Sequence, residues 1–85
     1  MVYRLDISQI AHRQIRKLPT STRERINKAI AGLGEKPRPY GTRKLTTGEG
    51  YRIRVGNYRV LYKVDDEARM VIVYRVMSRE DVYRL

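Results

Sequence analysis

The sequence predicts an α+β fold: an antiparallel sheet of about four strands, with an N-terminal strand and an αα-hairpin packed on one face. Three observations lead to this class and to the element order β-α-α-β-β-β. Two alternating runs flank Gly56-Asn57, two apolar stripes of helical period lie on either side of Pro19, and an apolar run covers 70–74. Helix and strand signals segregated in this way are typical of α+β folds. We expect one domain over 1–85, with a modest core.

The first strand and the first helix are predicted from the N-terminal residues. Residues 2–7 alternate apolar and charged side chains, which is typical of a strand with one covered face. Ser8 is placed to cap the helix that follows. The apolar residues of this helix recur at helical spacing, at Ala11, Ile15 and Leu18. Pro19 stops the helix, because proline lacks an N–H group and clashes with the preceding turn.

A second helix is predicted after Pro19. Ser21-Thr-Arg-Glu24 matches a capping box, in which the serine and glutamate side chains satisfy free backbone N–H groups. A stripe of helical period follows at Ile26, Ala29, Ile30 and Leu33, and Gly34 is placed to end the helix as its C′ residue. The short connection between the two helices predicts an antiparallel αα-hairpin on one side of the sheet.

The second half of the chain is predicted to consist mostly of strands. Two prolines exclude regular structure from 35–41, and 42–45 is a candidate for a short edge strand. The hairpin over 51–64 follows, with its turn at Gly56-Asn57. After an acidic turn at 65–68 comes a last strand, whose apolar run predicts burial on both faces.

Three arginines of this hairpin share one face. Because a two-residue loop fixes the register, Arg54 lies opposite Arg59, and Arg52 lies on the same face. Like charges directly opposite one another destabilise a sheet, so the arrangement favours a bound anion. The forked donors of arginine suit phosphate oxygens. Arginine-rich strand faces also occur simply because they are well solvated, and the residues alone leave both interpretations open.

The amino-acid composition limits the classes of binding partner and of catalytic mechanism that this protein can have. Lys and Arg number 19 against 9 Asp and Glu, a net charge of +10 that favours polyanionic partners such as nucleic acid. The absence of cysteine excludes a disulfide, a thiolate zinc site and a cysteine nucleophile. The single histidine, His12, excludes a histidine-pair ribonuclease mechanism. No apolar run is long enough to span a membrane and no signal peptide is visible, so we expect a cytoplasmic protein without a membrane partner.

No cofactor or metal site is expected. Asp65, Asp66 and Glu67 together could bind a cation, but they lack the spaced oxygen ligands of an EF-hand loop and fit an ordinary turn. The sequence also contains no glycine-rich phosphate loop and no dinucleotide-binding fingerprint. The hairpin arginines therefore remain the main candidate for chemistry.

Two segments of the chain carry a family resemblance. They are Tyr51-Arg-Ile-Arg-Val-Gly-Asn-Tyr-Arg-Val-Leu-Tyr-Lys-Val-Asp-Asp-Glu67 and the closing Arg79-Glu-Asp-Val-Tyr-Arg84. Together with the Leu18-Pro19 break and the Pro37/Pro39 loop, they resemble the RelE branch of the RelE/ParE toxin superfamily. The resemblance implies a single RelE-like toxin domain from a type II toxin–antitoxin pair. Its implied partners are a cognate acidic antitoxin, the ribosome and mRNA, and the toxin alone is expected to be monomeric.

The resemblance also implies an activity, that of a ribosome-dependent mRNA endoribonuclease that inhibits translation. In RelE relatives a ribose 2′-hydroxyl attacks the adjacent phosphate of mRNA in the ribosomal A site, leaving a 2′,3′-cyclic phosphate and a 5′-hydroxyl. By position, Arg52 and Arg54 match two basic residues of the family's hairpin, and Arg59 matches the arginine that contacts the phosphate. Arg79 matches a general acid or charge stabiliser, and Tyr83 matches the tyrosine that orients the substrate.

Two departures from the family pattern bear on the activity. Arg52 stands where the best-known relative has a general-base lysine, and a guanidinium is hardly ever deprotonated. Met77-Ser78 stands where many relatives have Gly-His. The general base is therefore unassigned. The alternative functions are a ParE-like inhibitor of DNA gyrase and a homologue that docks without catalysis.

Overall fold

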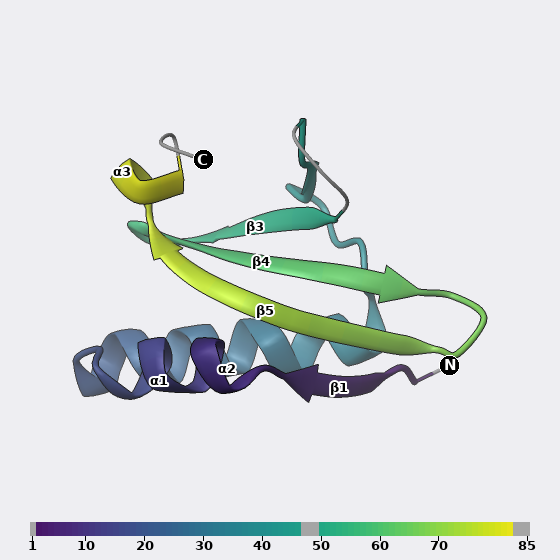
Figure 1. Ribbon diagram of the computed structural model, residues 1–85, viewed down its shortest axis with the longest axis horizontal. Coiled ribbons are helices and arrows are strands. Elements are labelled where there is room, and N and C mark those ends of the chain that lie inside the picture. Colours follow the sequence, from purple (N-terminus) through teal and green to yellow (C-terminus); the bar gives the residue numbers. More distant parts are fainter. Residues whose placement is uncertain (1, 47–49, 83–85) are drawn as a thin grey trace.

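The computed structural model describes residues 2–46 and 50–82, which form one five-stranded sheet with three helices (Figure 1). The elements are β1 (Arg4–Ile7), α1 (Gln9–Arg16), α2 (Thr20–Glu35), β2 (Arg43–Lys44), β3 (Tyr51–Val55), β4 (Tyr58–Asp65), β5 (Met70–Ser78) and α3 (Arg79–Val82). The strand order is β1-β5-β4-β3-β2. The predicted α+β class is confirmed. The sheet gains a fifth strand because the short segment at 43–44 pairs with β3.

The sheet is antiparallel except at one edge. β1 runs parallel to β5, with Arg4 opposite Met70 and Ile7 opposite Val73. Parallel neighbours need a long crossover connection, and the two helices and the hairpin lie between these strands in sequence. No helix in the described part of the chain is long and apolar enough to cross a membrane.

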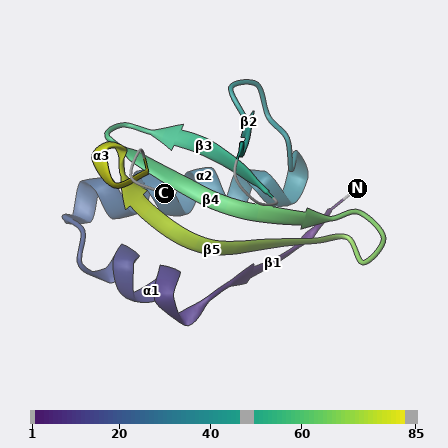
Figure 2. The ribbon, with the colours of Figure 1, turned by 45° about the horizontal axis from the view of Figure 1, so that its top comes forward.

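The core lies between the sheet and the two long helices. Figures 1 and 2 show α1 and α2 on the same side of the strands, and the opposite side carries only α3 at one end. Apolar residues of both helices and of β3, β4 and β5 form one buried cluster there, in which Ile26, Leu33 and Tyr62 are fully buried. The face without long helices is called the open face below. It carries Arg52, Arg54, Arg59, Leu61 and Lys63.

The helix ends agree only in part with the sequence signals. Ser8 caps α1 as predicted, because its Oγ accepts a hydrogen bond from the Ala11 N–H at 3.1 Å. The predicted capping box at Ser21 is wrong, since α2 begins at Thr20. Pro19 is the N-cap residue of α2, with φ −55°. Its carbonyl accepts the first helical hydrogen bond, from the Arg23 N–H at 2.9 Å.

Gly34 is not the C′ residue of the second helix, so this prediction is wrong. It lies inside α2, which ends at Glu35, and it is buried against β1. The Tyr3 N–H donates to the Gly34 carbonyl at 2.7 Å, and an added Cβ would lie 3.2 Å from the Tyr3 carbonyl oxygen. Glycine at this position therefore lets β1 approach the helix closely.

The β3–β4 hairpin forms with the predicted register. Val55 pairs with Tyr58 and Arg54 with Arg59, across the turn at Gly56-Asn57. Gly56 has φ +59°, and glycine at the first central position is typical of a type II′ hairpin turn. The prediction of the apolar face is also confirmed, since Ile53, Val55, Val60 and Tyr62 belong to the core cluster.

An irregularity between β4 and β5 places two consecutive residues of β5, Tyr74 and Arg75, on the open face. The register shifts so that Leu61 pairs with Arg75 and the next residue, Tyr62, pairs with Val73. Tyr74 is the extra residue on β5. Its ring lies 5.8 Å from the Lys63 ammonium, so it shares the open face with Arg75. The apolar run 70–74 is thus buried only on the helix side, and the prediction of burial on both faces is wrong because no long helix covers the other.

Two glycine substitutions, one before β3 and one in α2, are expected to change the stability of the protein in opposite directions. Gly50 has φ +123°, and an added Cβ would lie 2.7 Å from the Tyr62 carbonyl oxygen. Gly50→Ala should therefore lower the free energy of unfolding by more than about 1 kcal/mol. Gly32, in α2, has nothing within 4 Å of an added Cβ, so Gly32→Ala should raise it by about 1 kcal/mol. Urea denaturation of both variants checks the two signs.

Candidate active site on the open face

Four arginines line one pocket on the open face. Arg43 of β2 pairs with Arg52 of β3, and Arg54 of β3 pairs with Arg59 of β4, so the four side chains lie on the same side of the sheet. They and Gly41 line a pocket of about 300 Å³, called the arginine pocket below. No acidic side chain in the described part of the chain forms an ion pair with Arg43, Arg52 or Arg54. This clustering is the arrangement expected of a phosphate site.

Backbone carbonyls of the hairpin turn hold two of these arginines. Arg59 Nη1 donates to the Tyr58 carbonyl at 3.0 Å and to the Gly56 carbonyl at 3.4 Å. Arg54 Nε donates to the same Gly56 carbonyl at 3.3 Å. Arg59 is only 9% exposed, whereas Arg54 is exposed. The Gly56 carbonyl is thus a shared acceptor that orients the two guanidinium groups of this cross-strand pair.

The closing segment reaches the hairpin turn. The Arg79 N–H donates to the Asn57 carbonyl at 2.8 Å, and Ser78 pairs with Tyr58. Arg79 starts α3 and is exposed beside this turn. Tyr83, the remaining residue of the predicted site, lies outside the described residues. The structure therefore brings Arg52, Arg54 and Arg59 together, with the backbone of Arg79 next to their turn.

Arg43 is a site residue that sequence reasoning missed. It lies in a two-residue strand after a proline-containing loop, where no periodic signal reveals its face. Its basic charge and the candidate edge strand at 42–45 were the available signals, but its place in the pocket depends on pairing with Arg52. A longer β2 would have shown an alternation that identifies the face.

A cluster of hydrogen bonds holds the loop that precedes Arg43. The Arg38 guanidinium donates to both Asp66 oxygens, at 3.3 and 2.7 Å, and its Nε donates to the Tyr51 hydroxyl at 3.1 Å. The buried Tyr62 hydroxyl donates to the Pro37 carbonyl at 2.7 Å. These bonds tie the loop between α2 and β2 to the sheet and to the turn after β4.

The same cluster shifts the pKa of its members. Hydrogen bonds from Arg38 and then from Tyr3 lower the pKa of the Asp66 carboxyl below its ordinary value of 3.8. The hydrogen bond to Asp66 raises the pKa of the Tyr3 hydroxyl above 10.0. Because the folded-state pKa of Asp66 is lowered, its stabilising effect is present above the unfolded value and is lost as the pH falls through the folded value. The cluster should therefore stay intact at neutral pH and open in acid.

We expect Arg38→Ala to loosen the loop without unfolding the protein. The ion pair is exposed, with 40% and 57% of the two side chains accessible, so its loss should change the global stability little. The protection factors of the Thr42 and Arg43 amides should nevertheless fall, and those of wild type should fall in the same way as the pH drops through the lowered pKa of Asp66. Unchanged protection factors at these two amides in both experiments would contradict the role given to Arg38.

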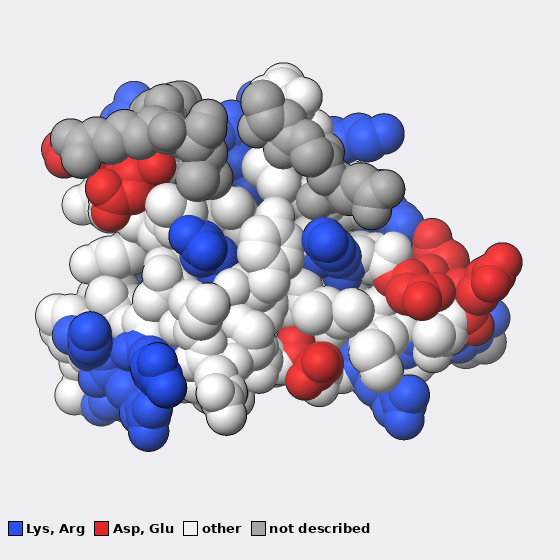
Figure 3. Space-filling view, viewed as in Figure 1, with Lys and Arg blue, Asp and Glu red and all other residues white. Residues whose placement is uncertain are grey.

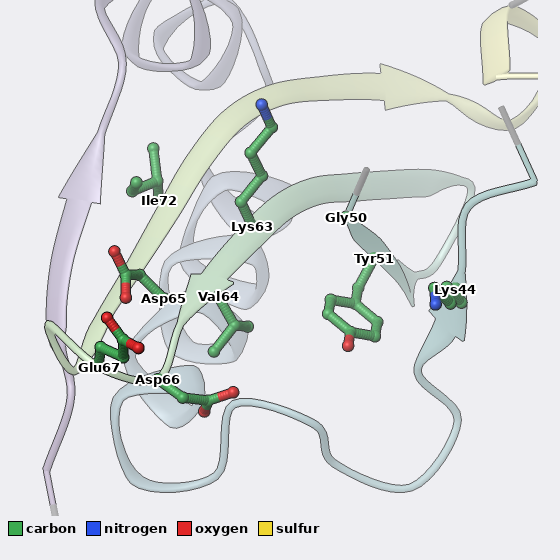
Figure 4. Close-up of a pocket in the computed structure, with 9 residues that line it drawn as sticks. All are labelled: Lys44, Gly50, Tyr51, Lys63, Val64, Asp65, Asp66, Glu67 and Ile72. Atoms are coloured by element: carbon green, nitrogen blue, oxygen red, sulfur yellow. The ribbon is translucent and has the colours of Figure 1, made fainter. Parts of the chain in front are cut away.

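A wider pocket of about 690 Å³ lies beyond the start of β3 (Figure 4). Figure 4 shows the acidic turn, Asp65 to Glu67, on one side of it and Lys44 on the other. Its charges are mixed, and no cluster of acidic or histidine side chains suited to a metal ion occurs among the described residues. Figure 3 shows acidic residues at both ends of this face and also near its middle. The arginine pocket differs from the wider pocket because no acidic residue lines it.

The fold and the arginine pocket define a small basic α+β protein with four arginines gathered on an open sheet face. Residues 5–83 match the family described as the ParE toxin of the type II toxin–antitoxin system parDE. The chain therefore belongs to this family of toxins.

Known relatives place the chain on the RelE branch of the superfamily, as the sequence predicts. It is 33% identical to toxin RelG of Mycobacterium tuberculosis, over 99% of both chains. It is also 33% identical to mRNA interferase toxin RelE of Escherichia coli, over 94% of this chain and 86% of the relative. The fold matches the toxin in the crystal structure of an archaeal RelE–RelB complex from Pyrococcus horikoshii. That match has a TM-score of 0.80 and 25% identity, over 93% of this chain and 97% of the other.

Proposed function

We propose that this toxin is a ribosome-dependent mRNA endoribonuclease that cuts in the A site and so inhibits translation. The observation that carries the proposal is the arginine pocket, in which four guanidinium groups converge on one open face. The E. coli relative at 33% identity is named an mRNA interferase, which favours cleavage over the ParE-like inhibition of gyrase that the sequence left open. Action on ribosomes would place the protein in the cytoplasm.

In the proposed reaction the ribose 2′-hydroxyl attacks the neighbouring phosphorus and the bond to the 5′-oxygen breaks. The products are a 2′,3′-cyclic phosphate and a 5′-hydroxyl. Arg54 and Arg59 hold the non-bridging oxygens, on which negative charge builds in the transition state. Arg52 adds charge but keeps its proton, so the proton of the 2′-hydroxyl leaves to water. Arg79, beside the turn, stabilises the departing 5′-oxygen, which takes up a proton, and Tyr83 orients the substrate. No metal ion takes part.

Cleavage on programmed ribosomes tests the proposal. Purified toxin is added to ribosomes that hold a defined mRNA with an empty A site, and new 5′ ends are mapped by primer extension. We expect cuts within the A-site codon that require both the ribosome and the toxin. No cuts under conditions in which the E. coli relative cuts would refute the activity, and a supercoiling assay would then test inhibition of gyrase.

We also propose an acidic antitoxin as the partner of this toxin. The toxin has a net charge of +10, and the archaeal relative crystallised as a RelE–RelB complex. Complementary charge speeds association, and this contribution weakens as salt screens it. The neighbouring gene product should therefore co-purify with the toxin, be net acidic, and associate more slowly at high ionic strength. A neutral or basic partner, or an association rate independent of salt, would contradict the proposal.

A further inference from the structure

A groove adjoins the arginine pocket on the side of α2. It has a volume of about 410 Å³ and shares Gly41 and Arg54 with the arginine pocket. Gly32 of α2, Ile53 of β3 and Tyr40 of the connecting loop also line it. The two cavities therefore meet at the residues that a phosphate in the arginine pocket would contact.

The groove stays open because β2 is short. β2 pairs with β3 only at Tyr51 and Arg52, so the edge of β3 from Ile53 onward has no strand beside it among the described residues. This uncovered edge gives a continuous path from the open face of the sheet to the surface of α2. A chain whose phosphate lies in the arginine pocket can thus place its neighbouring group in the groove.

Tyr40 presents a fully exposed aromatic ring at this groove. Every other tyrosine that the structure describes is at least partly buried. The loop that carries Tyr40 is held in place, since the Thr42 N–H donates to the Pro39 carbonyl at 3.0 Å and Tyr62 holds the Pro37 carbonyl. A ring presented on a fixed loop beside a cationic pocket is the arrangement by which proteins stack the bases of single-stranded nucleic acid.

We infer that this groove is a nucleobase subsite, in which Tyr40 stacks on the base next to the phosphate held by the arginine pocket. This inference rests on the proposed function and extends it to substrate recognition. Glu35 and Lys36 also line the groove, and they supply one acceptor and one donor for the edge of a base. The subsite would thus contribute both affinity and base preference to cleavage.

A binding experiment with short single-stranded RNA tests the subsite apart from the ribosome. The RNA carries 2′-O-methyl groups, which prevent cleavage, and either 2-aminopurine or an abasic residue beside the central phosphate. Wild type should bind the base-containing RNA about 10-fold more tightly than the abasic RNA and should quench the 2-aminopurine fluorescence. Tyr40→Ala should abolish this preference, and Tyr40→Phe, which keeps the ring, should restore it.

Gly32→Leu blocks the groove without disturbing the fold. An added Cβ at Gly32 meets nothing within 4 Å, and leucine is a better helix former than glycine, so the variant should be at least as stable as wild type. It should lose the preference for base-containing RNA while its affinity for abasic RNA stays the same. Ala31→Leu is the matched control, because Ala31 is exposed on α2 and does not line the groove.

The outcomes separate the subsite from the proposed activity. A preference for the base that persists in Tyr40→Ala and Gly32→Leu overturns the inference, whether or not wild type cuts mRNA on ribosomes. If these variants keep the preference but bind the antitoxin more weakly, the groove belongs to a polypeptide segment, and the inference is again overturned. Loss of the preference in both variants supports the subsite even if ribosomal cleavage fails, a failure that would count against the proposed function alone.

Discussion

Replacing Arg59 by alanine is expected to slow mRNA cleavage on programmed ribosomes about 100-fold. Arg59 is the most buried arginine of the pocket, and its guanidinium is oriented by the Tyr58 and Gly56 carbonyls. A pre-oriented donor stabilises the charge that builds on the phosphate oxygens, and removing one such donor typically costs 10²–10³ in kcat. Single-turnover cleavage at saturating toxin measures this chemical step directly.

Control variants show whether Arg59→Ala cuts slowly because a charge is lost or because the protein is less stable. Because Arg59 is buried, the thermal unfolding of Arg59→Ala must be compared with that of wild type. Arg54 is exposed, so Arg54→Ala should slow cleavage with little change in stability. Lys28→Ala removes one exposed charge from α2, far from the pocket in sequence, and should cut at the wild-type rate. A rate for Arg59→Ala within a few-fold of wild type would remove Arg59 from the proposed mechanism.

The hairpin could be predicted from the sequence because neighbouring residues alone determine its turn and its register. A two-residue loop and a period of two determine which residues face one another, and so Arg54 and Arg59 were placed correctly. Burial on the open face could not be predicted in the same way. Arg59 lies between Arg54 and Met77 on the neighbouring strands, and Leu61 lies between Arg52 and Arg75. Long side chains on the neighbouring strands thus flank these two residues on the open face.

The features that the sequence did not predict depend on one local competition and on contacts between distant segments. The capping box at Ser21 is a local signal, but the adjacent Pro19 starts the helix before it. Gly34 fits a helix end locally, yet its position is explained by the close approach of β1. Arg43 enters the pocket because Arg38 and Asp66, far apart in the chain, hold its loop against the sheet. The roles of Gly34 and Arg43 are decided by tertiary packing, which the periodicity of the sequence does not contain.

Replacing Arg52 by lysine is expected to accelerate cleavage, by about 10- to 100-fold. Arg52 pairs with Arg43 and lies in the pocket beside Arg54. The resemblance implies that it stands where the best-known relative has a general-base lysine. Arginine contributes charge there but cannot accept the 2′-hydroxyl proton. A lysine amine surrounded by three arginines would have a lowered pKa, because nearby positive charges disfavour its protonated form. A positioned general base typically adds 10²-fold or more to a rate, part of which the loss of the guanidinium fork would offset.

The pH dependence of cleavage distinguishes this gain from a simple change in affinity. Wild type should show little dependence between pH 6 and 9, because in the proposed reaction water, and no side chain, takes the 2′-hydroxyl proton. The cleavage rate of Arg52→Lys should rise with pH in this range, because a growing fraction of the new amine is free to accept a proton. Arg52→Gln has neither the charge nor a base, and it should be slower than both at every pH. A flat profile for Arg52→Lys at the wild-type rate would show that this position acts through charge alone. The 2′-hydroxyl proton would then have to leave by a route outside the arginine pocket.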